Sequence, residues 1–270
     1  MSEGTGRAAP PPELPELAPP LCVDPFPGAF GALLYAFYDA LWLVAAVLGS
    51  PWLAWRCLRR PGFARMLRER LAPPALAAAR SRVLVHGVSV GEIKGAVPLV
   101  RELAARHPEL DIAISTTTDT GFAVARALFP DRTVVRFPAD LSWVVRRFLR
   151  ALQPRCVILV ELEVWPNFLR EANRAGIPLA VVNGRITDRS HARYRLFRHL
   201  LPQFARISLF CVQGDDYARR FLDLGADRRR LVLTGNLKAD GLRIGRQDPG
   251  AELRKLIGPG RDQQVIVAGS

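Results

Sequence analysis

The stretch His86-Gly87-Val88-Ser89-Val90-Gly91-Glu92 decides the predicted fold, because it joins a buried strand to a helix through a short turn. Val83-Leu84-Val85 before it is an apolar run typical of a buried strand, and apolar residues at helical spacing run from Ile93 to His107. Glu92 therefore falls in the first helical turn. In an open α/β sheet this position faces the crevice beyond the carboxyl ends of the strands, where such folds bind ligands.

The same residues also fit a purely structural role. Ser89 and Glu92 have the spacing of a capping box, in which two side chains satisfy free backbone N–H groups at a helix start. Gly87 and Gly91 leave the backbone bare enough for a substrate to approach. From this stretch alone the capping role is the more common one, so a functional role for Glu92 depends on the rest of the chain.

Strands and helices alternate along the rest of the chain with short connections. Two further helical patterns run from Leu141 to Leu152 and from Phe168 to Ala175. Apolar strands alternating with helices are typical of a mostly parallel sheet with helices on both faces. We therefore predict one doubly wound, Rossmann-like α/β domain over residues 81–240. The predicted strands are Arg82–Val88, Asp111–Thr116, Thr133–Phe137, Cys156–Glu161, Pro178–Val182, Ile207–Val212 and Leu231–Thr234.

A hydrophobic segment, residues 29–57, precedes this domain and is predicted to be a membrane anchor. Its apolar run from Ala29 to Trp55 is longer than the ~20 residues that a helix needs to span a bilayer. Asp39 is the only carboxylate or base in that run, and Gly49 and Pro51 interrupt it. A helix lying in the membrane interface and a buried core helix are therefore the two alternatives.

A basic juxtamembrane segment, residues 58–80, follows the apolar run. Under the positive-inside rule, arginines beside a membrane segment favour the cytoplasmic side. We therefore predict that the following domain lies on that side. The arginines on or next to this segment include Arg56, Arg59, Arg60, Arg65, Arg68 and Arg70, against one acid, Glu69.

The two ends of the chain differ from the domain between them. Residues 1–28 are rich in Pro and are predicted to be a disordered extension. Residues 241–270 contain a polar stretch and then Val265-Ile266-Val267-Ala268, which predicts a linker and the first strand of a second domain. A strand that stops at Gly269-Ser270 cannot bury itself, so we expect the chain to be the front part of a two-domain protein.

Composition narrows the classes of partner. The 270 residues carry a formal net charge of +13, and such a surface favours anionic partners such as phosphorylated lipids and nucleotides. A solvated arginine surface without a partner explains the charge equally well. The sequence holds no recognition module for nucleic acid, so we predict no nucleic-acid partner. The four cysteines have neither disulfide-framework nor zinc-site spacing.

Four further motifs lie at predicted strand ends. Thr116-Thr117-Thr118-Asp119-Thr120-Gly121 follows the second predicted strand and offers hydroxyl and N–H groups at a helix start. Such groups suit phosphate or sugar oxygens, which makes Thr117 and Thr118 candidate ligand residues. Read alone, the motif is more often an N-cap followed by a turn.

The motif Glu161-Leu162-Glu163-Val164-Trp165-Pro166-Asn167 follows the fourth predicted strand and combines two carboxylates with an aromatic ring. Its Pro is suited to the first position of a helix. A solvated loop is the alternative, but Glu161 at the edge of a buried strand is costly without a partner. Glu161, Glu163 and Asn167 are therefore candidate site residues.

The last two motifs are weaker. Asn183-Gly184-Arg185 follows the fifth predicted strand and is either a simple turn or a source of a ligand-binding arginine, Arg185. Thr234-Gly235-Asn236-Leu237-Lys238 follows the last strand, where Lys238 either contacts phosphate or is merely exposed.

Taken together, the stretches HGVSVGE, TTTDTG, ELEVWPN, NGR and TGNLKAD resemble the 3-deoxy-D-manno-octulosonic acid (Kdo) transferases in order and spacing. These are inner-membrane glycosyltransferases that attach Kdo to the lipid A precursor. The resemblance covers about residues 30–270 and includes the apolar segment with its basic flank. Gly87 and Leu162 stand where the family often has Ala and Thr, and the extension before residue 29 is outside the pattern.

The resemblance implies a GT-B architecture of two Rossmann-like domains, with the acceptor held by the first and the donor, CMP-Kdo, mostly by the second. It implies Glu92 as the general base and Glu161 as a second carboxylate of the cleft, with no metal and no further cofactor. The remaining candidates for acceptor binding or positioning are Ser89, Gly91, Thr117, Thr118, Glu163, Asn167, Arg185 and Lys238.

The implied reaction is an inverting transfer of Kdo to the lipid A precursor, at the cytoplasmic face of the inner membrane, in lipopolysaccharide biosynthesis. It needs one base within hydrogen-bond reach of the acceptor hydroxyl, which Glu92 supplies. The arginines Arg185, Arg189, Arg193 and Arg195, like those that flank the apolar segment, are candidates to meet the phosphates of the lipid.

Two alternatives stay open. The first is a GT-B enzyme that uses another nucleotide sugar, because the donor would be selected mainly by a second domain. The second is a membrane-attached fragment that binds the acceptor without catalysis.

Overall fold

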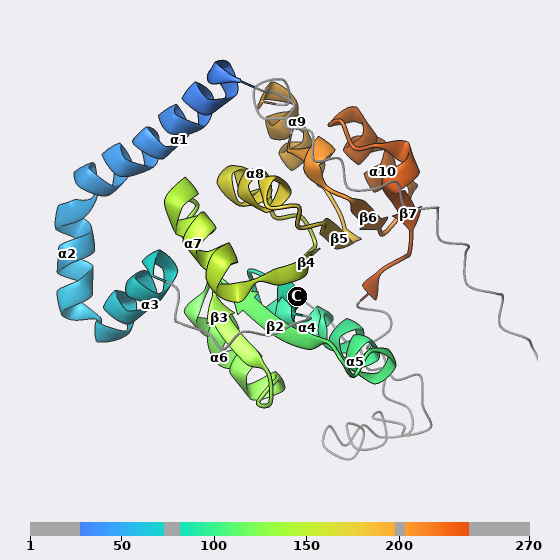
Figure 1. Cartoon of the computed structure of the whole chain (residues 1–270), viewed down its shortest axis with the longest axis horizontal. Coiled ribbons are helices and arrows are strands. Elements are labelled where there is room, and N and C mark those ends of the chain that lie inside the picture. The colour runs from blue at the N-terminus through green and yellow to red at the C-terminus, as the bar shows by residue number, and fades with distance from the viewer. Residues whose placement is uncertain (1–27, 73–81, 198–202, 238–270) are drawn as a thin grey trace, which may run out of the picture.

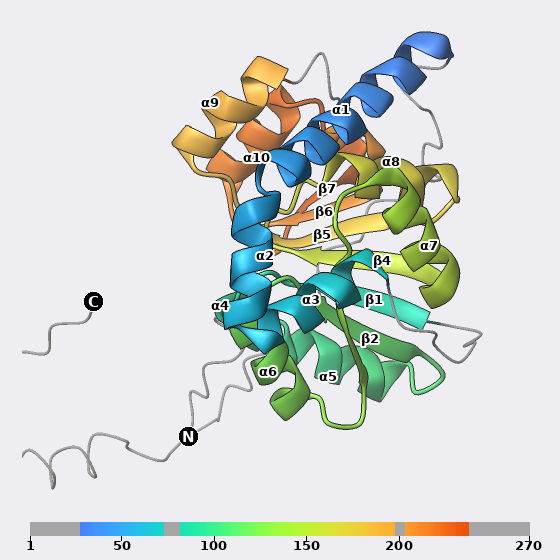
Figure 2. The same cartoon turned by 90° about the vertical axis from the view of Figure 1, so that its left-hand side faces the viewer.

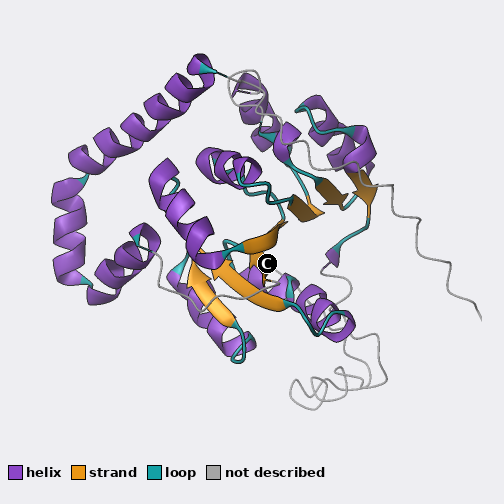
Figure 3. Cartoon of the chain, viewed as in Figure 1, coloured by secondary structure: helices purple, strands orange, loops and turns teal. Residues whose placement is uncertain are grey.

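The computed structural model describes residues 28–72, 82–197 and 203–237. In these residues seven strands form one parallel sheet in the order β3-β2-β1-β4-β5-β6-β7, with helices around it (Figure 3). Every predicted strand is therefore confirmed, with ends that shift by at most two residues. The strands are β1 (Arg82–His86), β2 (Asp111–Thr116), β3 (Thr133–Arg136), β4 (Pro154–Val160), β5 (Leu179–Gly184), β6 (Leu209–Val212) and β7 (Leu231–Leu233).

The central strands are buried on both faces, as parallel strands covered by helices must be. All five residues of β1 are buried. Leu84 belongs to one hydrophobic cluster, which includes Phe148 of helix α7 (Ser142–Leu152). Val85 belongs to the other cluster, which includes Ile93 of helix α4 (Val90–Gly95). The alternation of side chains along a strand divides the core in this way between the two faces of the sheet.

Helices cover both faces, so the predicted doubly wound α/β domain is confirmed. The helices α4, α5 and α6 supply the cluster around Ile93, and α7, α8 and α10 supply the cluster around Phe148. The helices of this region are α4 (Val90–Gly95), α5 (Val97–Arg106), α6 (Asp119–Leu128), α7 (Ser142–Leu152), α8 (Pro166–Arg174), α9 (Asp188–Phe197) and α10 (Asp215–Asp223), with 3-10 turns η1 (Phe204–Arg206) and η2 (Arg228–Arg230).

One helix prediction was wrong. The single helix expected from Ile93 to His107 is two helices, α4 and α5, which meet at Ala96. Pro98 lies in the first turn of α5, where its missing N–H group costs nothing, whereas the same residue inside a continuous helix would break a hydrogen bond. Apolar periodicity continues across the break, which is why the pattern alone did not detect it.

The order of the strands places the switch point of the sheet between β1 and β4. From β1 the chain goes to β2 and β3 on one side, and β4 then returns to pair with β1 on the other side. Ligands of doubly wound sheets bind beyond the carboxyl ends of the two strands at such a point. Glu92 follows β1 and Glu161 follows β4, so the fold brings these two predicted residues to one place.

The hydrophobic segment forms two helices rather than one. α1 (Ala29–Leu48) is long and apolar enough to cross a membrane by length and composition. Gly49 ends it, and α2 (Ser50–Arg59) and α3 (Pro61–Leu71) follow at angles to it. Figures 1 and 2 show the three helices wrapped around one side of the domain, with α1 passing α7 and α8.

α3 is fixed to the edge of the sheet. Arg70 donates from Nε to the carbonyl of Phe137, and Glu69 pairs with Arg136 of β3. The predicted basic segment is therefore partly a structural element of the domain. The predicted extension lies outside the described residues except for Gly28, as do Lys238 and the whole of residues 241–270.

Candidate functional site

The loop after β1 holds Glu92 in a fixed orientation. The Glu92 carboxylate accepts hydrogen bonds from the backbone N–H of Val88 at 2.8 Å and from the hydroxyl of Ser89 at 2.7 Å. The Ser89 Oγ in turn accepts from the backbone N–H of Glu92. The capping box read from the sequence is thus present, with the carboxylate bound one residue earlier than the usual N-cap N–H.

The capping role does not remove Glu92 from the site. Its side chain is buried, yet it lines a pocket together with Glu161 and Glu163. Gly87 packs tightly behind it, because a Cβ at that position would lie 3.1 Å from the Cβ of Glu92. Gly91 is exposed, and an added Cβ there would make only an ordinary contact. One carboxylate therefore caps the helix and faces the pocket at the same time.

The threonine motif after β2 holds the Glu92 loop in place through hydrogen bonds. Thr116 and Thr118 both donate from Oγ1 to the carbonyl of Val88, at 3.0 and 3.1 Å. Thr118 also caps α6 by accepting from the N–H of Gly121. The Thr118 hydroxyl is committed to these contacts, whereas the Thr117 Oγ1 is buried without a hydrogen-bond partner. Of the two predicted threonines, Thr118 is accordingly the one that supports the Glu92 loop.

The loop after β4 begins with strained backbone at Glu161, which has φ of +64° although it is not Gly. Such a conformation is rare for a residue with a Cβ and is maintained by the surrounding structure. The N–H of Glu161 donates to the carbonyl of Val182, and its carboxylate accepts from Nε of Arg185 at 3.0 Å. Two predicted site residues from different loops are thereby joined.

Glu163 is the carboxyl group with the most altered titration in the pocket. Burial, the charge of Glu92 and that of Glu161 raise the pKa of Glu163 to about 7, although a hydrogen bond from Nε1 of Trp165 at 2.9 Å opposes this. A carboxyl group that titrates near neutral pH is suited to proton transfer. The sequence marked Glu163 as a candidate, but not as the residue with this property.

The pocket itself lies at the switch point between the loops after β1, β4 and β5. Its volume is about 170 Å³, below the roughly 300 Å³ at which small-molecule pockets usually begin. The described residues therefore form an open concavity that is too small to enclose a substrate-sized molecule. The lining residues are Glu92, Glu161, Leu162, Glu163, Arg185, Ile186, Thr187, Ser190 and Tyr194.

Sequence reasoning missed the part of the pocket that comes from α9. Thr187, Ser190 and Tyr194 line it, and burial together with the charge of Glu163 raises the pKa of Tyr194. Arg220 holds this segment by donating to the carbonyl of Ile186. α9 has only weak amphipathic periodicity, so no local pattern marked these residues.

Asn167 lies away from the pocket. Its side chain is completely buried at the start of α8, where Nδ2 donates to Asp39 of α1 and to the carbonyl of Asp140. Asn183, which has φ of +57°, accepts from the N–H of Leu237 and so holds the last motif at the end of β5. Lys238 itself is beyond the described residues.

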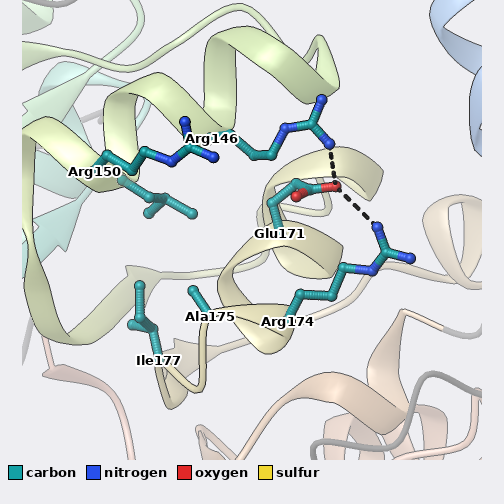
Figure 4. A pocket seen from close by; sticks show the side chains of 7 residues that line it. Arg146, Arg150, Glu171, Arg174, Ala175 and Ile177 are labelled. Carbon is teal, nitrogen blue, oxygen red and sulfur yellow. Dashed lines mark ion pairs between the residues drawn. The ribbon is translucent and has the colours of Figure 1, made fainter.

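A second concavity lies between α7 and α8, away from the three carboxylates of the switch-point pocket. Figure 4 shows Arg146 and Arg174 directed at Glu171, each 3.7 Å from its carboxylate. Both helices end at this side, just before β4 and β5 begin, so the concavity faces the amino ends of the strands. Its arginines balance a buried glutamate and are not part of the site at the switch point.

The fold and the site define a doubly wound α/β domain with three carboxylates at its switch point, an arrangement suited to proton transfer on a polar ligand. Among the residues that the structure describes, no cluster of His, Cys, Asp and Glu could hold a metal ion. A family described as 3-deoxy-D-manno-octulosonic-acid transferase (kdotransferase) matches residues 65–241. The chain belongs to this family of glycosyltransferases.

Individual relatives agree with that membership. The chain is 32% identical over 213 residues to a 3-deoxy-D-manno-octulosonic acid transferase of Haemophilus influenzae, covering 76% of this chain and 49% of that protein. It is 34% identical over 222 residues to the transferase of the same name from Bordetella pertussis, covering 75% and 51%. The chain thus spans about half the length of these curated relatives.

Among solved structures, the chain is similar to UDP-GlcNAc 2-epimerase from Neisseria meningitidis bound to UDP-GlcNAc. The TM-score is 0.48 at 13% sequence identity, with coverage of 66% of this chain and 51% of that one.

Proposed function

We propose that the protein containing this chain transfers Kdo from CMP-Kdo to the lipid A precursor, lipid IVA, in lipopolysaccharide biosynthesis. One observation carries the proposal: a buried carboxylate, Glu92, is held by two hydrogen bonds where it lines the switch-point pocket of a Kdo transferase family member. In this proposal Glu92 is the general base.

The proposed step is an inverting substitution. The acceptor hydroxyl oxygen bonds to the anomeric carbon of Kdo while the bond from that carbon to the CMP phosphate breaks, and Glu92 takes the hydroxyl proton. Val88 and Ser89 keep the carboxylate oriented, which lowers the cost of bringing base and acceptor together. No metal and no cofactor takes part in the proposal. Because the described pocket is too small to enclose a substrate, we propose that a second domain holds the donor.

The other pocket residues are proposed to position the acceptor. Arg185 offers a guanidinium beside the carboxylates, and Glu163 can hold or release a proton near neutral pH. Ser89, Gly91, Thr117, Thr118 and Glu161 shape the loops, and Lys238 is proposed to approach from the last motif. Asn167 is completely buried away from the pocket, so we propose that it positions the loop instead of contacting the acceptor.

We further propose that the protein lies at the cytoplasmic face of the inner membrane, with α1 in the membrane interface. One face of α1 is bound to the domain through Tyr35 and Asp39, so a docked α1 runs along the domain instead of leaving it. Its other faces expose apolar side chains, among them Leu33, Phe37 and Leu48. Of the flanking arginines, Arg59, Arg60, Arg65 and Arg68 are exposed and suited to anionic lipid.

The test is mass spectrometry of tetra-acylated lipid A precursor after incubation with CMP-Kdo and the full-length protein in detergent. We expect a mass gain of one or more Kdo units. Glu92→Gln should abolish it with little loss of thermal stability, since Oε1 of Gln can accept from the N–H of Val88 while its Nε2 donates to Oγ of Ser89. Glu102→Gln, on the exposed surface of α5, is the matched control and should transfer normally.

Three results would contradict the proposal in different ways. Normal transfer by Glu92→Gln would remove Glu92 as the base. Transfer from a UDP-sugar but not from CMP-Kdo would establish a different donor. Binding of the lipid without transfer from any nucleotide sugar would favour the non-catalytic alternative.

A further inference from the structure

α1 contains polar residues that an apolar anchor does not need, and these face the domain. Asp39 accepts two hydrogen bonds at Oδ1, from the N–H of Ser142 at the start of α7 and from Nδ2 of Asn167. Tyr38 donates to Oδ2 of Asp140 at 3.1 Å. Ionisable residues in a helix that contacts lipid are costly and therefore indicate a function.

Asp140 and Asn167 form the centre of this contact. Asp140 is buried and accepts hydrogen bonds from the backbone N–H groups of Asn167 and Phe168. Both N–H groups lie in the first turn of α8, where they have no partner within the helix. Asn167 Nδ2 bridges from the carbonyl of Asp140 to Asp39 at 2.7 Å on each side. The first turn of α8 is therefore tied to α1 by side chains that are more than 100 residues apart in sequence.

A second contact holds α1 further towards its amino end. Tyr35 is buried, and its hydroxyl accepts from Arg206 at 2.7 Å and from Gln203 at 2.9 Å. The guanidinium of Arg170, one turn along α8 from Asn167, lies 4.1 Å from the centre of the Tyr35 ring. The docking of α1 is thus an extended interface along α8 and not a single contact.

The residue tied to α1 ends the loop that carries two of the pocket carboxylates. Glu161, Glu163 and Trp165 lie between the end of β4 and Asn167. β4 fixes one end of this loop, and the first turn of α8 fixes the other. Within the loop, Trp165 hydrogen-bonds to Glu163 and packs 5.8 Å from the ring of Phe137, so movement of the α8 start is passed to Glu163.

We propose that Asp39 is a positioning residue, through which the docked helix α1 sets the geometry of the Glu161–Trp165 loop. The membrane-facing helix is then a part of the site's framework, and the loop is ordered for reaction only while α1 is docked. The consequence for the reaction rests on the proposed transferase function. The mechanical link from Asp39 to the loop does not.

The test uses the full-length protein in detergent micelles and compares Asp39→Leu, Asp39→Asn, Tyr38→Phe and Leu128→Ala with the wild type. Leu removes the acceptor at position 39, Asn retains a carbonyl oxygen that can accept both hydrogen bonds, and Phe deletes one hydroxyl. Leu128 is exposed on α6 and serves as the control. Steady-state transfer and hydrogen exchange of peptides covering residues 161–168 are measured for each variant.

We expect Asp39→Leu to lower kcat by roughly 10- to 100-fold with little change in the KM for CMP-Kdo, because the loop is displaced while the donor surface is intact. Asp39→Asn should recover most of this loss. Amide exchange should accelerate at residues 161–168 in Asp39→Leu and, to a smaller degree, in Tyr38→Phe. Leu128→Ala should match the wild type in kcat and in exchange.

Unchanged exchange of the loop in Asp39→Leu would overturn the proposal whatever the activity. Faster exchange throughout the sheet, including β1 and β2, would also overturn it, because Asp39 would then act on stability alone. If Asp39→Leu does not fold, Tyr38→Phe and Asp39→Asn decide by the same exchange measurement. If the variants show the expected differences in exchange but the wild type transfers no Kdo, the transferase function is refuted. The link from Asp39 to the loop would still hold.

Discussion

Arg185 donates from Nε to the carboxylate of Glu161 at 3.0 Å, and this ion pair joins the loop after β5 to the loop after β4. The Glu161 side chain is 14% exposed, whereas that of Arg185 is 50% exposed. The pair therefore places a partly solvated cation at the rim of a group of three carboxylates. Its main effect is on the charge and order of the site and less on the stability of the domain.

Replacement of Arg185 should separate these two effects. We expect Arg185→Gln to lower kcat/KM for Kdo transfer by about tenfold or more, because the Glu161 loop loses a fixed contact. The free energy of unfolding should change by less than about 1 kcal/mol, as for other half-exposed pairs. Transfer kinetics and thermal unfolding of the full-length protein measure both quantities. Arg126→Gln, at an exposed position on α6, is the control, and an equal loss in that variant would refute a specific role for Arg185.

Glu163 should make stability depend on pH. Its pKa of about 7 in the folded protein exceeds the ordinary value of 4.5, so the folded state holds the proton more tightly between these pH values. The resulting stabilisation is complete below about pH 4.5 and is lost as pH rises through 7. At about 1.4 kcal/mol for each pKa unit, the loss is at most ~3.5 kcal/mol.

Glu163→Gln should remove this dependence because Gln stays neutral. We expect the unfolding midpoint of Glu163→Gln to rise relative to the wild type between pH 5 and pH 8. Asp140, whose pKa burial raises to about 6, acts in the same direction but is common to both proteins and cancels in the comparison. A difference between the two proteins that is constant across this range would show that Glu163 titrates normally.

Much of the fold was predictable from the sequence because strands covered on both faces leave an unambiguous apolar signal. Val83 to Val85, Ile112 to Ile114 and Val157 to Val160 are examples, and each lies in a strand of the parallel sheet. The strand-to-helix turns then place Glu92 and Glu161 at one edge without further information. Local pattern and sheet order together were sufficient for this part of the site.

The remainder depended on contacts between distant residues. Asn167 belongs to the same motif as Glu161, yet it faces α1 because Asp39 and Asp140 bind it there. The raised pKa of Glu163 results from burial and from the charges of Glu92 and Glu161, and neither the burial nor the approach of Glu92 is visible in the local sequence. Tyr194 enters the pocket from a helix with little amphipathic pattern. Sequence spacing identified the motifs but not the direction of their side chains.

Gly121 should be among the glycines least tolerant of substitution. A Cβ at this position would lie 2.6 Å from Oγ1 of Thr116 and 2.7 Å from Oγ1 of Thr118, the two hydroxyls that hold Val88. We expect Gly121→Ala to destabilise the domain by roughly 1–3 kcal/mol and to lower transfer, since the Glu92 loop loses its support. Gly62→Ala in α3, where a Cβ meets nothing within 4 Å, should leave the unfolding midpoint unchanged or slightly higher. Equal midpoints for the two variants would contradict the crowding at Gly121.

The exposed apolar side chains of α1 and α2 should determine membrane binding. Leu48 is 78% exposed and Leu58 is 84% exposed, which is unfavourable in water and favourable when the helices lie in a membrane interface. Each Leu→Ala substitution should weaken binding of the full-length protein to anionic vesicles by roughly 1–2 kcal/mol, or about tenfold, because less apolar surface is removed from water.

Leu128→Ala on α6 provides the comparison, since Leu128 is also exposed but lies outside α1 and α2. Vesicle flotation should show normal binding for Leu128→Ala and weakened binding for Leu48→Ala and Leu58→Ala. Added salt should weaken vesicle binding by all three variants further. The exposed arginines beside α2 are attracted to anionic headgroups, and salt screens this attraction. Equal binding by the three variants would place the membrane contact elsewhere on the molecule, and binding that is indifferent to salt would exclude the arginines from it.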